Sequence, residues 1–166
     1  MALVDRVNTT LVLLVKKSDG KISDICLAYK KRGFGAGRWN GIGGKLKHPN
    51  ETIEDAARRE AAEEIGVKVN KLVKVAELNF IFPHHPTWNQ LMYVFLADTW
   101  QGEPTESEEM KPQWFKISNI PYANMWPDDT FWLPEVLKGH LVKGEFEFKS
   151  GDIINSYKLA RVDKLL

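Results

Sequence analysis

The chain has 166 residues, of which 43% are hydrophobic and 27% are charged, and its formal net charge is +1. This length and composition predict one globular domain, residues 1–166, with enough apolar side chains to bury a core. The small net charge argues against a protein that holds long nucleic acid by counterion release. The single cysteine, Cys26, excludes a disulfide framework, and no apolar run of the sequence is long enough to cross a bilayer. We therefore expect a cytoplasmic monomer with a small-molecule partner.

The first half of the chain reads as two strands, a glycine-rich segment and a helix. Residues 9–17 and 25–30 are apolar and β-branched, which predicts strands. The glycines of residues 33–44 favour tight turns and close approach of the backbone to another group. Residues 52–65 predict a helix, because Thr52 and Asp55 resemble a capping box and Gly66 suits the position after the last turn.

The second half adds strands and one more helix. Residues 73–82 and 91–99 predict two strands joined by a polar segment, and shorter strands are expected at 114–116, 146–149 and 157–162. A second helix is predicted at 128–138, after Pro127. Helices interspersed among strands in one domain predict an α/β architecture.

Three carboxylates share one face of the first predicted helix. Glu60, Glu63 and Glu64 stand at positions i, i+3 and i+4, where like charges repel one another unless a cation lies over them. Mg²⁺ prefers carboxylate oxygens completed by phosphate oxygens, and Arg59 is placed to orient one of the carboxylates. A solvated acidic face is the competing interpretation, and the helix alone does not separate the two.

This pattern resembles the Nudix box, G-x5-E-x7-R-E-U-x-E-E-x-G-U, in which U is an aliphatic residue. The matching positions are Gly44, Glu51, Arg59, Glu60, Glu63, Glu64, Gly66 and Val67. The chain departs from the pattern in two places: the loop between Gly44 and Glu51 is one residue longer, and the small Ala61 stands where a larger aliphatic residue is usual. The insertion leaves the register of the helix intact.

The resemblance implies a Nudix fold, in which a mixed β-sheet is sandwiched between α-helices. It implies a hydrolase of nucleoside diphosphates linked to another group, with Mg²⁺ or Mn²⁺ as cofactor. By the same resemblance, Glu60, Glu63, Glu64 and the carbonyl of Gly43 bind the metal, and Arg59 belongs to the catalytic set. Water attacks phosphorus while the metal neutralises charge on the phosphate oxygens, and a carboxylate removes the proton.

Beyond the box, the chain resembles the oxidised purine nucleoside triphosphatases, the animal-type 8-oxo-dGTPase branch of the family. The likeness lies in residues 30–41, 106–112 and 125–129. It implies cleavage of 8-oxo-dGTP and 2-hydroxy-dATP to the monophosphate and pyrophosphate, which would sanitise the nucleotide pool. The residues carried over are Asn40, Asp128 and Asp129 for the base edge, Trp126 for stacking, Phe34 and Trp132 for the pocket lining, Thr10 for its floor, and Glu109 as an aid to the metal.

Several of these residues can be examined on their chemistry alone. Two adjacent carboxyl groups beside tryptophan do not both ionise readily, so Asp128 and Asp129 are expected to share one proton near neutral pH, giving a donor and an acceptor. A plain helix N-cap is the alternative for this pair. Lys30 and Lys45 are expected to contact phosphates, although a solvated basic loop would have the same composition.

The substrate and the class of activity each have an alternative. Residues 83–89 do not follow the pattern of the oxidised purine branch, and we expect them to border the pocket. A Nudix hydrolase of an ADP-sugar, a dinucleotide or an O6-alkylated purine triphosphate fits the same box. A non-catalytic nucleotide-binding module is the third interpretation, and the intact acidic set argues against it.

Overall fold

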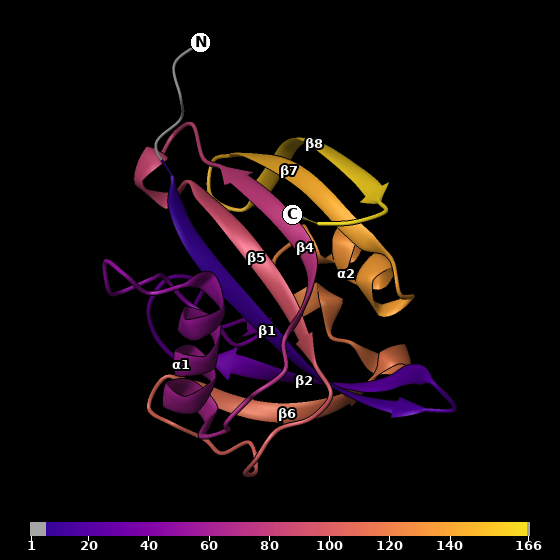
Figure 1. Cartoon of the computed structure of the whole chain (residues 1–166). Coiled ribbons are helices and arrows are strands. Elements are labelled where there is room, and N and C mark those ends of the chain that lie inside the picture. The colour runs from indigo at the N-terminus through magenta and orange to yellow at the C-terminus, as the bar shows by residue number, and fades with distance from the viewer. Residues whose placement is uncertain (1–5, 166) are drawn as a thin grey trace.

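The computed structural model describes residues 6–165, which form one mixed sheet with helices on both of its faces (Figure 1). The strands are β1 (Val7–Ser18), β2 (Lys21–Lys30), β3 (Trp39–Asn40), β4 (Val73–Ile81), β5 (Gln90–Ala97), β6 (Met110–Lys116), β7 (Leu141–Lys149) and β8 (Ile153–Val162). The helices are α1 (Ile53–Ile65) and α2 (Asp129–Leu137), with short 3-10 helices η1 (Pro86–Trp88), η2 (Ile117–Asn119) and η3 (Tyr122–Asn124). None of the helices in the described part of the chain is long and apolar enough to cross a membrane.

Strand order explains how distant segments meet. The order is β3-β2-β1-β5-β4-β7-β8, and β6 also pairs with β2. β1 runs parallel to β5, and β4 runs parallel to β7, whereas the other pairs are antiparallel. The centre of the sheet therefore joins residues more than 80 positions apart, such as Val7 and Gln90.

The side chains of β1 alternate between two hydrophobic cores. Leu11 and Leu13 pack in a core that includes Trp132 of α2, and Val12 and Leu14 pack in a second core with α1. In Figure 1, α1 lies beside β1, β2 and β6, and α2 lies next to β7. A sheet between helices is the fold class that the sequence predicts.

The ends of α1 follow the predicted signals. The Thr52 hydroxyl accepts a hydrogen bond from the backbone N–H of Asp55 at 3.0 Å, and Gly66 ends the helix with a φ of 72°. The small Ala61 is fully buried, which lets α1 lie close to the sheet. Burial also raises the pKa of the Cys26 thiol in β2 to about 11, in keeping with an inert core cysteine.

The structure differs from the predicted elements mainly in the second half of the chain. The expected strands at 146–149 and 157–162 are parts of a longer hairpin, in which Leu141 pairs with Val162. β8 is an edge strand with largely exposed side chains, so its apolar alternation is weak. β6 begins at Met110 rather than at residue 114, and the two-residue β3 was not predicted. Asp128 occupies the N-cap position of α2, as the plain N-cap interpretation expects, but its side chain makes no capping hydrogen bond.

Candidate active site

A cavity of about 180 Å³ opens at one end of the sheet, where several strands and two loops converge. Its polar lining consists of Thr9, Thr10, Lys30, Asn40, Lys45, Gln90, Asp128 and Asp129. Its apolar lining consists of Leu11, Phe34, Phe80, Phe82, Met92, Met110, Trp126 and Phe148, and the backbone of Gly41, Gly43 and Gly44 completes the wall. A concave, mainly apolar space with a few converging polar groups is typical of a small-molecule site.

The glycine wall separates this cavity from α1. A Cβ atom on Gly43 would lie 1.7 Å from the carbonyl oxygen of Thr10, so the backbone runs directly against β1 and has no room for a side chain. A Cβ atom on Gly44 would lie 2.7 Å from Oε1 of Glu60. Gly44 thus has the cavity on one side and a carboxylate of α1 on the other.

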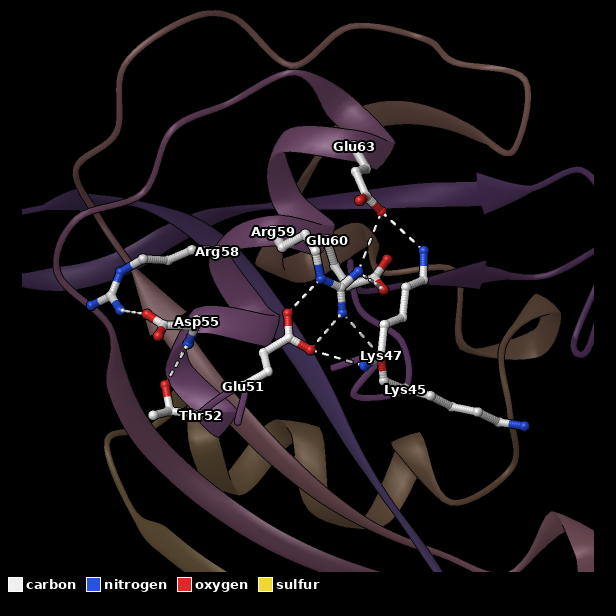
Figure 2. Close-up of polar contacts among 9 residues, drawn as sticks. All are labelled: Lys45, Lys47, Glu51, Thr52, Asp55, Arg58, Arg59, Glu60 and Glu63. Carbon is white, nitrogen blue, oxygen red and sulfur yellow. Dashed lines mark hydrogen bonds and ion pairs between the residues drawn. The ribbon is translucent and has the colours of Figure 1, made fainter. Parts of the chain in front are cut away.

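Arg59 organises the carboxylates of α1 (Figure 2). Its Nε atom donates to Oε1 of Glu51 at 2.5 Å, and its Nη1 atom donates to Oε1 of Glu60 at 2.8 Å and to Oε2 of Glu63 at 3.3 Å. The same guanidinium donates to the carbonyl of Lys45 at 3.1 Å. Arg59 therefore ties the glycine loop to the helix and fixes the position of Glu60.

The Glu51 side chain anchors this network from the loop. It is 6% exposed and accepts hydrogen bonds from Arg59 and from the backbone N–H of Lys47. The hydrogen bond from Arg59, followed by the one from Lys47, lowers the pKa of Glu51 to about 2. The one-residue insertion in this loop therefore leaves the Glu51–Arg59 ion pair in place.

Glu60 and Glu64 place two carboxyl groups in a site with little solvent. Both residues are buried, and Oε2 of Glu64 has no hydrogen-bond partner among the described residues. Burial, followed by the charge of Glu60, raises the pKa of Glu64 to about 8, and the charge of Lys30 opposes this shift. Lys30 also lines the cavity, so its charge acts both on Glu64 and on any ligand bound in the cavity.

The donor set on α1 fits a divalent cation. Buried carboxylate oxygens, one of them without a partner in the described structure, are hard ligands of the kind that Mg²⁺ takes, and a cation would offset the repulsion between Glu60 and Glu64. Across residues 6–165, however, no three His, Cys, Asp or Glu side chains are arranged as a complete metal site. Glu63 is drawn toward Lys47, whose Nζ atom lies 3.3 Å from it, and Glu109 is paired with Arg32 at 3.4 Å.

On another part of the cavity wall, Asp128 and Asp129 form a second buried pair. The indole N–H of Trp132 donates to Oδ2 of Asp128 at 2.9 Å, whereas Oδ2 of Asp129 has no partner within residues 6–165. Burial raises the pKa of Asp128 to about 6. Burial, the charge of Asp128 and a hydrogen bond between the two carboxyl groups raise the pKa of Asp129 well above its usual range. Burial therefore favours a protonated form of this pair.

Trp126 forms part of an aromatic wall beside these acids. Its ring stacks against Phe34, with centroids 5.2 Å apart and an interplanar angle of 28°. Phe82 and Phe148 meet it edge-on, at 6.4 and 6.0 Å. Trp88 contacts Phe34 and Phe82 from outside, at 5.0 and 5.6 Å. The sequence predicts that residues 83–89 border the pocket; none of them lines the cavity, but Trp88 supports its wall from behind.

Most of the residues that the sequence predicts for base, phosphate or metal contact lie together around the cavity. Thr10, Lys30, Phe34, Asn40, Gly43, Trp126, Asp128 and Asp129 line it, as does Lys45. Trp132 does not line it: the residue is 1% exposed and lies behind Asp128, which corrects the expectation for this side chain. The amide oxygen of Asn40 accepts a hydrogen bond from the Gly41 N–H at 2.9 Å, so its NH₂ group is the part free to face the cavity.

Sequence reasoning missed two polar residues of the cavity, Thr9 and Gln90. The Thr9 hydroxyl donates to the amide oxygen of Gln90 at 3.1 Å, and the Gln90 amide donates to the carbonyl of Trp88 at 3.3 Å. Period-two alternation in β5 puts Gln90 and Met92 on one face. The sequence contains no signal that this face borders the cavity, because the parallel pairing with β1 is a long-range contact.

Comparisons with known proteins agree with this geometry. Residues 3–136 match the model of the NUDIX domain family. The chain is 47% identical over 154 residues to the oxidized purine nucleoside triphosphate hydrolase of Mus musculus, covering 93% of this chain and 94% of the mouse protein. The protein of the same name from Danio rerio is 46% identical over 158 residues, covering 94% and 96%. A crystal structure of a MutT protein from Bacillus halodurans superposes with a TM-score of 0.78 at 24% identity, covering 92% of this chain and 97% of that one.

Proposed function

The chain belongs to the Nudix family of hydrolases, and from this membership we propose that it cleaves oxidised purine nucleoside triphosphates to the monophosphate and pyrophosphate. 8-oxo-dGTP and 2-hydroxy-dATP are the expected substrates, and their removal would sanitise the nucleotide pool. The observation that carries the proposal is the buried, proton-sharing pair Asp128–Asp129 on a cavity whose glycine wall touches Glu60. The names of the mouse and zebrafish relatives support the same substrate class.

At the base end of the cavity, the chemistry follows from hydrogen-bond capacity. A protonated Asp129 donates and an ionised Asp128 accepts, and the proton can move between them because the two groups are adjacent. Such a pair suits the altered donor and acceptor edges of both oxidised guanine and oxidised adenine. Asn40 offers N–H donors, and Trp126 offers a flat surface for stacking, worth about 1–3 kcal/mol per base.

At the phosphate end, Glu60, Glu64 and Glu63 would hold Mg²⁺, or Mn²⁺, with the Gly43 carbonyl and Glu109 as further ligands. When bound, the metal supplies a positive charge that stabilises the developing charge on the phosphate oxygens. Arg59 orients Glu60, and Lys30 and Lys45 on the cavity wall would attract the polyphosphate. Burial and the charge of Glu60 raise the pKa of Glu64 to about 8, and a cation bound beside it would favour the ionised carboxylate that a metal ligand requires.

We further propose that residues 1–166 act as one Nudix domain. The protein would work as a cytoplasmic monomer on a small nucleotide, without long nucleic acid or a membrane as partner. The net charge of +1 supports the exclusion of long nucleic acid as a partner.

The test is a substrate panel with the full chain and Mg²⁺. Pyrophosphate release would be measured for 8-oxo-dGTP, 2-hydroxy-dATP, dGTP, dATP, O6-methyl-dGTP and ADP-ribose. We expect kcat/KM for the oxidised purines to exceed that for dGTP and dATP by roughly tenfold or more, the equivalent of one good hydrogen bond. A preference for ADP-ribose or the alkylated purine would replace the proposed substrate, and tight binding without turnover would indicate a non-catalytic module.

A matched pair of variants on α1 tests the proposed metal ligands. Glu60→Gln should lower kcat by roughly a hundredfold or more, because a metal contributes several kcal/mol of charge stabilisation. Glu54→Gln changes an exposed carboxylate in the first turn of the same helix and should leave kcat unchanged. Equal activity of the two variants would remove Glu60 from the ligand set.

A further inference from the structure

Arg38 links three parts of the chain beside the cavity. It follows the glycine loop, and its guanidinium carbon lies 4.3 Å from the centroid of the Trp126 ring. The same guanidinium forms an ion pair with Asp152, in the turn between β7 and β8, 114 residues away in the sequence. Neither residue lines the cavity, and the mechanism above uses neither.

The contact with the indole is a cation–π interaction. Nη1 of Arg38 is buried and has no hydrogen-bond partner in the described part of the chain, which fits a nitrogen that faces the π surface of a ring. A guanidinium is planar, so it can lie flat on an indole while another edge pairs with a carboxylate. The Asp152 carboxylate therefore fixes the guanidinium, and the guanidinium in turn constrains the plane of Trp126.

Buried Phe82 and Phe148 meet the edge of the Trp126 ring, whereas the neighbours that the glycine loop supplies are less firmly held. Phe34 stacks against the indole but is an exposed residue between Gly33 and Gly35, both of which have positive φ. A Cβ atom on Gly35 would lie 3.0 Å from Nε1 of Trp126, so the loop lies directly against the edge of the indole. Of these neighbours, Arg38 is the one tied by a charged contact to a second element.

Resting on the proposed function, we propose that Arg38, held by Asp152, is a positioning residue for base binding. It fixes the plane of the Trp126 indole on which the base stacks, and so sets the affinity for the nucleotide rather than the rate of cleavage. Partly exposed ion pairs contribute little to stability. Asp152 is 46% exposed in its side chain, so the role of the pair lies in orientation rather than in holding the fold together.

Kinetic variants test this role. Arg38→Gln and Asp152→Asn should raise the KM for the oxidised triphosphate by roughly three- to tenfold, the scale of a lost cation–π contact, and should leave kcat within about twofold. Arg38→Lys keeps a cation but not the planar fork, so its KM should fall between those of the wild type and Arg38→Gln. Arg161→Gln removes another exposed arginine–carboxylate pair, with Glu135 at 2.6 Å, and should change neither constant.

A spectroscopic measurement separates this proposal from the proposed function. The emission of Trp126 is obtained in the absence of nucleotide as the difference between each protein and the same protein carrying Trp126→Phe. We expect a red shift and stronger acrylamide quenching in Arg38→Gln and Asp152→Asn, and no change in Arg161→Gln. Unchanged emission, or a wild-type KM in Arg38→Gln, overturns the positioning role. A shift in a protein that does not cleave oxidised purines overturns the proposed substrate and leaves Arg38 as the residue that orients Trp126.

Discussion

Two pairs of buried carboxyl groups lie near the cavity, one in its lining and the other behind its glycine wall. Asp128 and Asp129 line the cavity directly, and burial raises the pKa of both carboxyl groups. Glu60 and Glu64 lie behind the glycine wall, next to Arg59 and within the field of Lys30. Unpaired charge in a poorly solvated site is unfavourable, so burial favours a proton on the first pair, and at the second pair either a proton on Glu64 or a bound cation lowers the charge.

The shared proton gives Asp129→Asn a distinctive pH dependence. The pKa of Asp129 is raised in the folded protein, so folding favours its protonated form, and the stability of the wild type falls as pH rises from about 4 through the folded pKa. Asparagine does not titrate and can still donate to Asp128. We expect the variant to be more stable than the wild type by about 1–3 kcal/mol at pH 8.5, with little difference at pH 4.

Thermal unfolding at the two pH values measures this difference, and activity measures its functional consequence. With a permanent donor at position 129, kcat/KM should fall by about tenfold or more for the oxidised purine that needs the proton on Asp128, and should change less for the other. Asp98→Asn, which removes an exposed carboxylate 3.3 Å from Lys17, is the control. A stability difference between variant and wild type that does not grow with pH would contradict the shared-proton description.

At this scale, the sequence predicts what a residue can do better than where it lies. The acidic pair, Asn40 and the glutamates of α1 are identified from local spacing and resemblance, and the structure places Asn40 and both aspartates on the cavity. Trp132 is aromatic, as a pocket residue should be, but it lies behind Asp128 and donates a hydrogen bond to it. The local sequence does not show whether a side chain lines the cavity or lies behind it. The packing of helix α2 on the sheet decides which side chains face the cavity.

At the scale of the elements, glycine has two different uses in α1 and the loop before it. Gly44 provides space, since a Cβ atom would lie 2.7 Å from the Glu60 carboxylate. Gly66 provides backbone freedom, since its φ is 72° and a Cβ atom there would point into open space. These two glycines of the Nudix box therefore serve activity and stability, respectively.

The matched substitutions Gly44→Ala and Gly66→Ala separate the two uses. Gly44→Ala should lower kcat by roughly tenfold or more, because it displaces a proposed metal ligand, with a smaller effect on the melting temperature. Gly66→Ala should lower the free energy of unfolding by about 1 kcal/mol and leave kcat unchanged. Steady-state kinetics and denaturant unfolding on both variants measure these quantities, and the reverse ranking would refute the assignment.

The segment between β4 and β5 is a second element whose role becomes clear only in three dimensions. Asn89 is 4% exposed, and its side-chain oxygen accepts from the Phe82 N–H at 2.6 Å. Its own N–H donates to the Pro86 carbonyl, and its carbonyl accepts from the N–H of Val7. Asn89 therefore ties the end of β4 and η1 to the start of β1.

Asn89→Ala should destabilise the protein by about 1–3 kcal/mol, because a buried N–H loses its acceptor. It should also raise the KM for the oxidised triphosphate, because Phe82 and Trp88 support the aromatic wall. The control is Asn155→Ala, whose side chain makes an exposed bond to Glu147 at 3.0 Å. Equal melting temperatures for the two variants would show that the 83–89 segment does not depend on Asn89.

Element boundaries were predictable where local signals are strong. The ends of α1 follow from Thr52 and Gly66, and β1 follows from a run of β-branched and apolar residues. The sequence predicts only short parts of the β7–β8 hairpin. The hairpin is stabilised by pairing between its strands, and the edge strand β8 has many polar side chains, so its apolar pattern is weak. The role of the 83–89 segment in the wall depends on contacts with Phe34, some 50 residues earlier.

At the scale of the whole molecule, the site unites segments from nearly every part of the chain. The cavity lining begins at Thr9 in β1 and ends at Phe148 in β7. A ligand that spans this lining binds only the folded state, so it should stabilise the entire domain rather than a local region. Occupation of the base and phosphate ends should also be coupled, because both share the wall formed by Gly43 and Gly44.

Product binding measures this coupling through the melting temperature. The oxidised purine monophosphate with Mg²⁺, at about 100 times its dissociation constant, should stabilise the protein by about 2.7 kcal/mol and raise Tm by roughly 5–10 °C. Chelation by EDTA should remove part of this rise, and Glu64→Gln should make Tm insensitive to Mg²⁺. An unchanged Tm shift after chelation would mean that the metal does not contribute to nucleotide binding.

The parallel pairing of β1 with β5 also has a consequence for the order in which the chain folds. The hydrophobic core on which α1 packs includes side chains of three strands. They are Val12 and Leu14 of β1, Phe95 and Ala97 of β5, and Met110 of β6. The helix is therefore synthesised well before the surface on which it packs is complete. Closing so long a loop is slow, and contacts of high sequence separation form late. The helix with Glu60, Glu63 and Glu64 must then wait, undocked, until about 45 further residues have joined the nascent chain.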